Sequence, residues 1–241
     1  MSHAMPSGPR ILIIPAFNEE QRLEKVLTAV AEAALGFEVV VIDDGSRDTT
    51  GSVAARCGAT VIRHPFNLGY GAALQTGYKY ALECAASLVV QMDADGQHDP
   101  REIVGLIAPI VDGTCDLIVG SRFLQGGTYK MGVVRNIGRA LFRALARLAG
   151  LKVSDPTSGF QAMSHAVLEV YSHDFFPTDY PDVDVLLTAH QHGLRVSEHP
   201  VRMAESGRRS TLHGGLRPVY YVYKMLLSMW SASFRRRGRQ T

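Results

Sequence analysis

The sequence has little that would place it inside a membrane or in an oxidising compartment. Its 241 residues contain no run of about 18 uninterrupted apolar residues, so we expect no membrane-spanning helix. The three cysteines, at positions 57, 84 and 115, are too scattered for a disulfide framework or a zinc knuckle, which predicts structural thiols in a reducing compartment. No signal peptide is recognisable, and we expect residues 1–9 to be a tag or disordered leader.

Extremes of composition are also missing. Apolar residues make up 46% of the chain and charged residues 20%, as in ordinary globular proteins. This composition excludes disorder, collagen and coiled coil as the main state. The length is sufficient for one large α/β domain with a substantial core, and no repeat or linker divides the chain.

Acidic residues are absent from residues 121–152, where seven basic residues occur. Residues 201–241 hold nine basic residues and one acidic residue, although the formal charge of the whole chain is only +2. Two basic blocks on an otherwise acidic chain favour an anionic partner that is met at particular places. The alternative is that both blocks are solvated helix faces.

Short apolar runs alternate with helix-length segments over the first half of the chain. The runs predict five buried strands, at residues 11–14, 39–42, 59–62, 88–92 and 116–120. The segments between them predict helices, the first capped by Asn18 and the others at residues 49–57, 70–85 and 101–112. This order is typical of an α/β fold in which helices cover both faces of a mostly parallel sheet.

Ligands of such a sheet lie beyond the carboxyl ends of its strands, and polar residues are concentrated there in this sequence. Asp93 and Asp95 follow one strand and can aim two carboxylates at one point, with Gln97 close behind. Hard oxygen ligands of this kind suit Mg²⁺ or Mn²⁺ together with substrate phosphate oxygens. A solvated turn is the alternative, and His98 is either a further ligand or a solvated turn residue.

Two other segments at this edge have a less specific meaning. Asp43 and Asp44 form either a tight turn or a contact to a ribose or base. The glycine-rich residues 67–73 open a helix and can bring the backbone close to a ligand. They match neither a P-loop nor a G-x-G-x-x-G fingerprint, which disfavours ATPase and dehydrogenase functions.

Five of these segments together resemble the inverting glycosyltransferases of family 2, in order and in spacing. The segments are Pro15–Glu19, Val41–Ser46, Asn67–Gly71, Asp93–Gln97 and Gly120–Phe123. The branch that makes dolichyl- or polyprenyl-phosphate sugars is the most similar, over about residues 10–210. The resemblance implies a single-domain GT-A fold, Rossmann-like, that uses a GDP- or UDP-linked sugar with Mg²⁺ or Mn²⁺.

The resemblance also implies site residues. Those expected to contact the nucleotide are Pro15, Phe17, Glu19, Ile42, Asp44, Asn67, Gly71, Asp93 and Ala94. Asp93 is expected to face the ribose and the sugar, while Asp95 and Gln97 hold the metal on the diphosphate. Arg122 is expected near the donor or acceptor phosphate, and residues 155–160, with Ser158, beside the acceptor.

The expected phosphate-binding arginine near the end of the domain is replaced by Ala204, so Arg202, Arg208 or Arg209 takes its place. A hydroxyl acceptor would need a general base, whereas a phosphate is already anionic. Asp182 matches the base of hydroxyl-acceptor members, although Pro181 stands where they carry Glu; the alternative is that Asp182 is a helix N-cap. We expect Asp93, Asp95, Asp182 and Arg122 to be the catalytic residues.

The basic segments favour a lipid phosphate acceptor. Arg135, Arg139, Arg143 and Arg147 recur every four residues and therefore form one helical stripe, which is typical of contact with an anionic membrane surface. We expect Arg135 and Arg139 to contact the acceptor phosphate, together with Arg202 and Arg209. An ordinary amphipathic surface helix is the alternative. We accordingly expect residues 10–212 to form the glycosyltransferase domain and residues 213–241 an amphipathic helix with a basic tail.

That tail helix is suited either to a membrane interface or to a homodimer contact. We expect a cytoplasmic enzyme held peripherally at the inner face of the cell membrane, with polyprenyl phosphate as acceptor. The other functions that stay open are transfer to a hydroxyl acceptor and, from another class, non-catalytic binding of sugar nucleotides. Nucleic acid is not expected as a partner, because no recognition motif accompanies the basic blocks.

Overall fold

The computed structural model describes residues 8–33, 35–124, 140, 143–144, 146–147, 150–178 and 181–204. They form an α/β structure around one seven-stranded sheet with the strand order β3-β2-β1-β4-β6-β5-β7. The strands are β1 (Arg10–Ala16), β2 (Glu38–Asp43), β3 (Thr60–Arg63), β4 (Leu88–Gln91), β5 (Leu117–Ser121), β6 (Gln161–Ser164) and β7 (Val196–Pro200).

Six of the strands run parallel to one another, and only β6 is reversed. β1 pairs in parallel with β2 and β4, β2 with β3, and β5 with β7. β6 lies between β4 and β5 and is antiparallel to both. The expectation of a mostly parallel sheet in a single α/β domain is therefore confirmed. Strands β6 and β7 were not predicted, because neither segment is a continuous run of β-branched residues.

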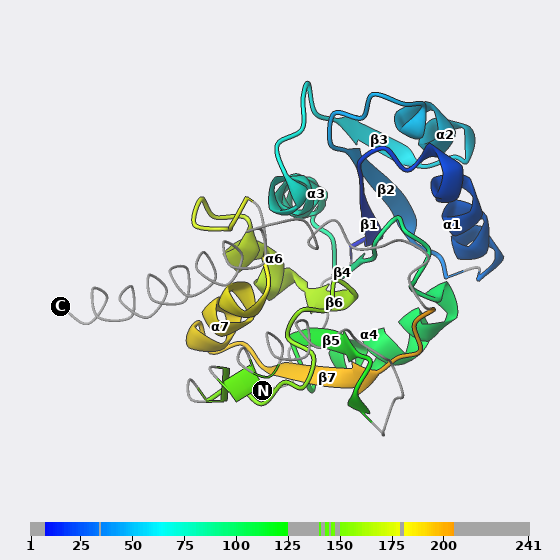
Figure 1. Ribbon diagram of the computed structural model, residues 1–241. Helices are drawn as coiled ribbons and strands as arrows, with labels where there is room; N and C mark the ends of the chain where they lie inside the picture. Colours follow the sequence, from blue (N-terminus) through cyan, green and yellow to red (C-terminus); the bar gives the residue numbers. More distant parts are fainter. Residues whose placement is uncertain are drawn as a thin grey trace.

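Helices cover both faces of the sheet (Figure 1). One face carries α1 (Glu20–Glu32), α2 (Thr50–Arg56) and α4 (Ile103–Val111), the last preceded by a 3₁₀ turn, η1 (Pro100–Glu102). The other face carries α3 (Tyr70–Glu83), α6 (His165–Tyr171) and α7 (Val183–Gln191).

The central strands are buried on both sides, as expected for a sheet covered by two helical layers. Ile11 and Ile13 of β1 belong to the core under α3, whereas Leu12 and Ile14 belong to the core under α1. This alternation follows from the two-residue period of a strand. It explains why the sequence shows a continuous apolar run here instead of an alternating one.

The predicted helices of the first half are confirmed, but one predicted cap is wrong. The four apolar residues expected to face the core from α1 are all buried there: Leu23, Val26, Leu27 and Val30. Asn18 does not cap this helix, whose N-cap is Glu19 without a side-chain hydrogen bond. Instead the Asn18 Oδ1 accepts a hydrogen bond from the backbone N–H of Arg47, at 2.9 Å.

Some expectations cannot be compared with the structure. The described residues end at 204, so the proposed boundary at 212 and the tail of residues 213–241 lie outside them. Within the described part of the chain, every helix is too short or too polar to cross a bilayer.

Candidate active site

The Asp44 carboxylate organises the loops at the carboxyl edge of the sheet. Asp44 directly follows β2 and is buried. Its Oδ1 accepts a hydrogen bond from Leu68 N–H at 2.8 Å and lies 2.7 Å from the Nδ1 of His64. Its Oδ2 accepts from Gly69 N–H at 3.0 Å. One side chain therefore fixes the segment that leads into α3, a role that the sequence did not reveal.

A second set of contacts joins the loop after β1 to the loop after β2. The backbone N–H of Asn18 donates to Ser46 Oγ at 3.0 Å, and Asn18 adopts the left-handed conformation with φ of 54°. Gly45 lies so close to Phe66 that a Cβ there would be 2.4 Å from the Phe66 carbonyl carbon. Three loops therefore pack together, and the exposed ring of Phe17 lies on them.

The residues expected to contact the nucleotide fall into two groups. Phe17 and Asn67 are exposed on these loops and are accessible to a ligand. The others are buried beneath the loops or engaged by protein groups: Pro15, Glu19, Ile42, Asp44, Gly71 and Ala94. Nucleotide contacts by these eight residues, and by Asp93 as the ninth, stay predictions.

Gly71 illustrates how a glycine can be required for packing alone. A Cβ at this position would lie 2.0 Å from the carbonyl oxygen of Pro177, and Ala72 N–H donates to the carbonyl of Thr178 at 3.0 Å. Gly71 therefore lets the start of α3 pack closely against the backbone of residues 177–178.

Asp93 lies beyond the end of β4, in the middle of the sheet, where β4 pairs with the reversed strand β6. Tyr70 donates its hydroxyl to Asp93 Oδ1 at 2.8 Å, and the His98 Nε2 lies 3.1 Å from Oδ2. Burial by itself would raise the pKa of this carboxyl, but the hydrogen bonds from His98 and Tyr70 and the charge of Arg122 outweigh burial and lower the pKa below its usual value. Asp93 is therefore a fixed, ionised carboxylate.

The backbone of Gly159 closes the other side of Asp93. A Cβ at Gly159 would lie 2.8 Å from Asp93 Oδ2 and 2.9 Å from the Tyr70 hydroxyl. The carbonyl of Gly159 accepts a hydrogen bond from Gln91 Nε2 at 2.9 Å, and the Gln91 Oε1 accepts one from Tyr78. Only glycine fits between these groups, so the segment before β6 forms part of the same site.

Asp95 and Gln97 can supply oxygen ligands to a divalent ion. Asp95 is half-buried and accepts hydrogen bonds from the Gln97 backbone N–H, at 2.9 Å, and from the Gln97 side-chain amide. Both residues offer hard oxygen atoms, which suit Mg²⁺ or Mn²⁺. In the part of the chain that the structure describes, three His, Cys, Asp or Glu side chains nowhere converge. The residues therefore fit an ion that is shared with substrate oxygens.

Arg122 and Asp155 form a buried ion pair beside Asp93. The Arg122 Nε and Nη2 donate to the two oxygens of Asp155 at 2.7 and 2.8 Å, and the side chains are 9% and 0% exposed. Glu198 of β7 accepts hydrogen bonds from the backbone N–H groups of Ser154 and Asp155, at 2.7 and 2.8 Å. The pairing of Arg122 with Asp155 was not predicted. It fixes the Arg122 guanidinium, which the sequence analysis expects near a substrate phosphate.

The segment after β7 reaches the turn that contains Asp95 and Gln97. Met203 forms a β-bridge with His98, and Ala204 N–H donates to the Gln97 carbonyl at 2.8 Å. This places the exposed Arg202 near that turn. Ser158 is buried in the loop before β6. The remaining predicted phosphate ligands, Arg135, Arg139 and Arg209, lie outside the described residues.

Asp182 was predicted to be either a general base or a helix N-cap, and its side chain does not cap the helix. It occupies the N-cap position of α7 but makes no capping hydrogen bond through its side chain. Asp184 Oδ1 instead accepts from the backbone N–H groups of Asp182 and Val185, at 3.1 and 3.0 Å. The charge of Asp182 acts on Tyr70, which connects α7 electrostatically to the Asp93 side of the site.

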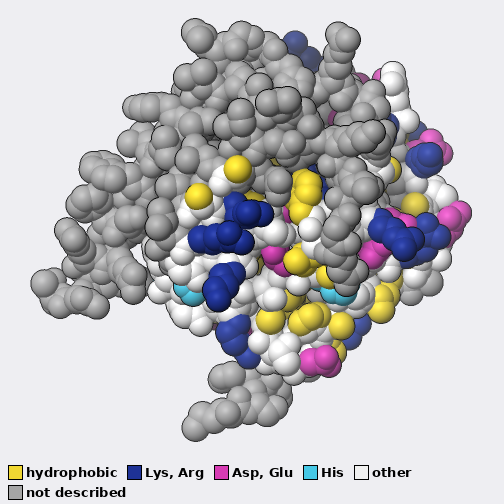
Figure 2. Space-filling view, turned by 60° about the horizontal axis from the view of Figure 1, so that its bottom comes forward, with side chains coloured by type: hydrophobic (Ala, Val, Ile, Leu, Met, Phe, Trp, Pro, Cys, Tyr) yellow, Lys and Arg dark blue, Asp and Glu magenta, His cyan; other side chains and the backbone are white. Residues whose placement is uncertain are grey.

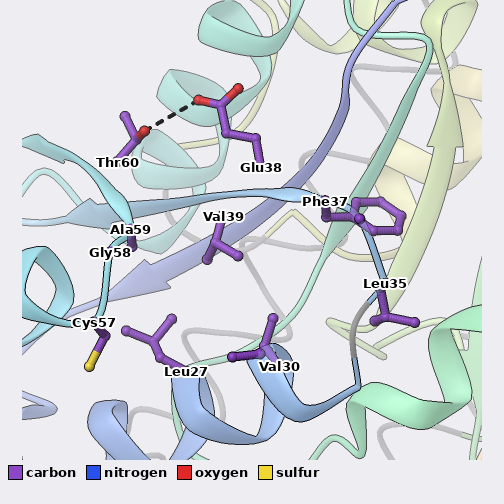
Figure 3. A pocket seen from close by; sticks show the side chains of 12 residues that line it. Leu27, Val30, Leu35, Phe37, Glu38, Val39, Cys57, Gly58, Ala59 and Thr60 are labelled. Atoms are coloured by element: carbon purple, nitrogen blue, oxygen red, sulfur yellow. Dashed lines mark hydrogen bonds between the residues drawn. The ribbon is translucent and has the colours of Figure 1, made fainter.

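Two hollows in the described surface differ in their position relative to these residues. A hollow of about 280 Å³ next to Asp95 is lined from α1 by Arg22 and Lys25, which sequence reasoning missed. Another, of about 340 Å³, lies at the opposite edge between α1 and the start of β2 (Figure 3). Its lining is largely apolar and includes Leu27 and Val39, so it offers few groups for chemistry.

The buried Arg122–Asp155 pair gives a stability prediction. Replacing Asp155 with Asn leaves a buried guanidinium without its counter-charge, which should lower the free energy of unfolding by about 3–5 kcal/mol. Asp174→Asn is the matched control, because Asp174 is fully exposed and 4.0 Å from Lys79, and its loss should cost less than about 1 kcal/mol. Urea denaturation measures both, and equal losses would contradict the assignment.

Known proteins that resemble this chain give a consistent result. Residues 11–172 match the family model described as Glycosyl transferase family 2. A UDP-N-acetylglucosamine–dolichyl-phosphate N-acetylglucosaminyltransferase of Methanococcus voltae is 30% identical over 211 residues, which cover 79% of this chain and 84% of the relative. A polyprenol monophosphomannose synthase of Mycolicibacterium smegmatis is 31% identical, over 83% of this chain and 79% of the relative.

The fold also resembles a solved structure. Glucosyl-3-phosphoglycerate synthase from Mycobacterium tuberculosis, in complex with Mn²⁺ and UDP-glucose, superimposes with a TM-score of 0.68 at 25% identity. The match covers 92% of this chain and 79% of that structure. The predicted GT-A architecture is therefore confirmed, and a non-catalytic binding protein is excluded by the family match. The chain belongs to glycosyl transferase family 2 and is a glycosyltransferase.

Proposed function

We propose that this glycosyltransferase transfers a sugar, with inversion, from a GDP- or UDP-linked donor to the phosphate of a polyprenyl phosphate. The observation that carries the proposal is the ionised Asp93 carboxylate, fixed between the nucleotide-side loops and the segment before β6. Two relatives named for transfer to dolichyl phosphate and for polyprenol monophosphomannose synthesis support this acceptor class.

The donor would lie across the carboxyl edge of the sheet. The exposed Phe17 and Asn67 would contact the base, and the turn of Asp95 and Gln97 would meet the diphosphate. A divalent ion bound there would neutralise negative charge on the leaving diphosphate. The UDP-glucose and Mn²⁺ complex of the structural relative supports both the donor class and the ion.

The acceptor would approach from the side of Arg122 and Asp155. A phosphate oxygen is already ionised at neutral pH, so attack on the anomeric carbon requires no general base. Arg122 is held rigidly by Asp155, which presents its charge from one fixed place. A fixed positive charge stabilises negative charge at the reacting centre without reorganisation.

Transfer to a hydroxyl is the second candidate, and one observation favours it. Asp182, which matches the base of hydroxyl-acceptor members, lies at the N-terminal end of α7. Its charge also acts on Tyr70, which contacts Asp93. Under this alternative Asp182 would remove the proton of the attacking hydroxyl.

Peripheral binding at the cytoplasmic face of a membrane is part of the same proposal. A lipid acceptor and the basic segments of residues 121–152 and 201–241 support it. In Figure 2 the described Lys and Arg side chains form separate groups, with hydrophobic and acidic side chains between them. On the face shown, the described basic side chains therefore form no single continuous surface. A homodimer through the tail stays a prediction.

Metal-dependent donor binding is testable at Asp95. Asp95→Ala removes a carboxylate ligand from the diphosphate side, which should lower kcat on the order of 10²–10³-fold and weaken the binding of UDP or GDP in Mn²⁺. Sugar transfer and calorimetric titration measure the two effects. Asp99→Ala is the control, because Asp99 lies in the same segment but pairs with Arg101. Full activity in excess chelator would contradict the proposal.

The acceptor class is testable at Asp182. With a polyprenyl phosphate acceptor, Asp182→Asn should keep kcat within about tenfold of the unmodified enzyme, because no proton has to be removed. With a hydroxyl acceptor the same change should cost on the order of 10²–10⁴ in kcat. The measurement is transfer to a short-chain prenyl phosphate. Absence of transfer by the unmodified enzyme, with several UDP- and GDP-sugars, would favour the hydroxyl alternative.

A further inference from the structure

Tyr70 is a polar contact of the candidate active site to which neither the sequence analysis nor the family resemblance assigns a role. It is the first residue of α3 and donates its hydroxyl to Asp93 Oδ1 at 2.8 Å. Although 37% of the residue is exposed, its hydroxyl lies between Asp93 and the backbone of Gly159. The side chain of Tyr70 therefore reaches from the protein surface to the Asp93 carboxylate.

Asp93 is held from two sides by residues of different elements. Tyr70 of α3 binds one carboxylate oxygen, and His98 of the following turn binds the other. The His98 ring is itself fixed by packing on Phe160, with ring centroids 4.8 Å apart. With both hydrogen bonds present the carboxylate plane has one orientation, whereas loss of either bond would leave the group free to rotate about its Cβ–Cγ bond.

The phenol of Tyr70 acts here as a donor and not as a base. Burial and the negative charge of Asp93, with a smaller contribution from Asp182, raise the pKa of Tyr70 well above its usual value. The hydroxyl therefore keeps its proton at any physiological pH and donates a hydrogen bond to the Asp93 carboxylate.

The neighbours of Asp93 indicate which part of the donor this carboxylate meets. Gly159 lies beside Asp93, and the charge of Arg122 acts on it. Both residues come from the half of the chain that is expected to bind the acceptor. Tyr70, the other neighbour, directly follows the loop held by Asp44, which belongs to the half expected to bind the nucleotide. A carboxylate at the boundary between donor and acceptor is placed for the sugar that passes from one to the other.

We propose that Tyr70 is a positioning residue that orients the Asp93 carboxylate toward a hydroxyl of the transferred sugar. The inference rests on the proposed function, since it requires a sugar nucleotide as donor. It follows that Tyr70 affects the binding of the sugar nucleotide more than the binding of the free nucleoside diphosphate, which keeps its ribose but lacks the transferred sugar.

The test compares Tyr70→Phe with Tyr80→Phe, a matched loss of one phenolic hydroxyl. Tyr80 also donates to a carboxylate, the Oε1 of Glu38 at 2.7 Å, but Glu38 lies at the opposite edge of the sheet (Figure 3). Binding of UDP, UDP-glucose, GDP and GDP-mannose is measured by calorimetry in Mn²⁺, and kcat by sugar transfer to a short-chain prenyl phosphate. Both variants keep the ring, so thermal unfolding should show that they fold.

Tyr70→Phe should lower the affinity for the sugar nucleotide, or kcat, on the order of 10- to 100-fold, which is the effect of one lost hydrogen bond to a charged group. Its affinity for the free nucleoside diphosphate should stay within twofold of the unmodified enzyme. Tyr80→Phe should leave all of these values unchanged. Equal weakening of UDP and UDP-glucose, or of GDP and GDP-mannose, would mean general disruption and would overturn the inference, as would unchanged sugar-nucleotide binding and kcat.

A double-mutant cycle with Asp93→Asn shows whether Tyr70 acts through Asp93. In the Asp93→Asn background, adding Tyr70→Phe should cause no further loss of sugar-nucleotide affinity. Additive losses would overturn the inference while leaving the proposed function intact. Failure of the unmodified enzyme to bind any of the four nucleotides would instead overturn the proposed function.

Discussion

The candidate active site depends on buried and half-buried carboxylates that must find hydrogen-bond donors in other loops. A buried carboxylate without donors is costly, so each one forces a neighbouring segment into place. Asp44 fixes the entry to α3, Asp93 joins that helix to the turn after β4, and Asp155 joins the loop before β6 to Arg122. Glu198 extends the chain of contacts to β7. The loops are rigid because these charges have to be satisfied.

The reversed strand β6 brings the two halves of the site together. Its first residue, Gln161, pairs with Gln91 at the end of β4 and with Val119 near the end of β5. An antiparallel strand begins where its parallel neighbours end, so the segment that precedes β6 must cross the carboxyl edge of the sheet. This is why Gly159 touches Asp93 and Asp155 meets Arg122, although the partners are far apart in sequence.

The sequence predicted what depends on local pattern and missed what depends on topology. Continuous β-branched runs identified β1, β2 and β4, and spacing identified the buried face of α1. The pairing of Arg122 with Asp155 could not be predicted from the sequence, because it depends on where β6 lies in the sheet. The residues of β6, Gln-Ala-Met-Ser, are not typical of a strand. Tyr70 was missed because its glycine-rich segment was interpreted through its backbone alone, and only the fold shows that its side chain reaches Asp93.

Charge balance indicates why a donor diphosphate would need cations at this edge. Close to Asp93, the carboxylates of Asp93, Asp95 and Asp155 outnumber the guanidinium of Arg122, which already has its counter-charge. A diphosphate brought there would be repelled unless cations accompany it. Arg22 and Lys25 beside Asp95, a divalent ion at Asp95 and the basic residues after position 120 are the sources of positive charge. Under the proposed function, the acidic edge and the basic groups are therefore complementary, because together they would hold two phosphate-bearing substrates.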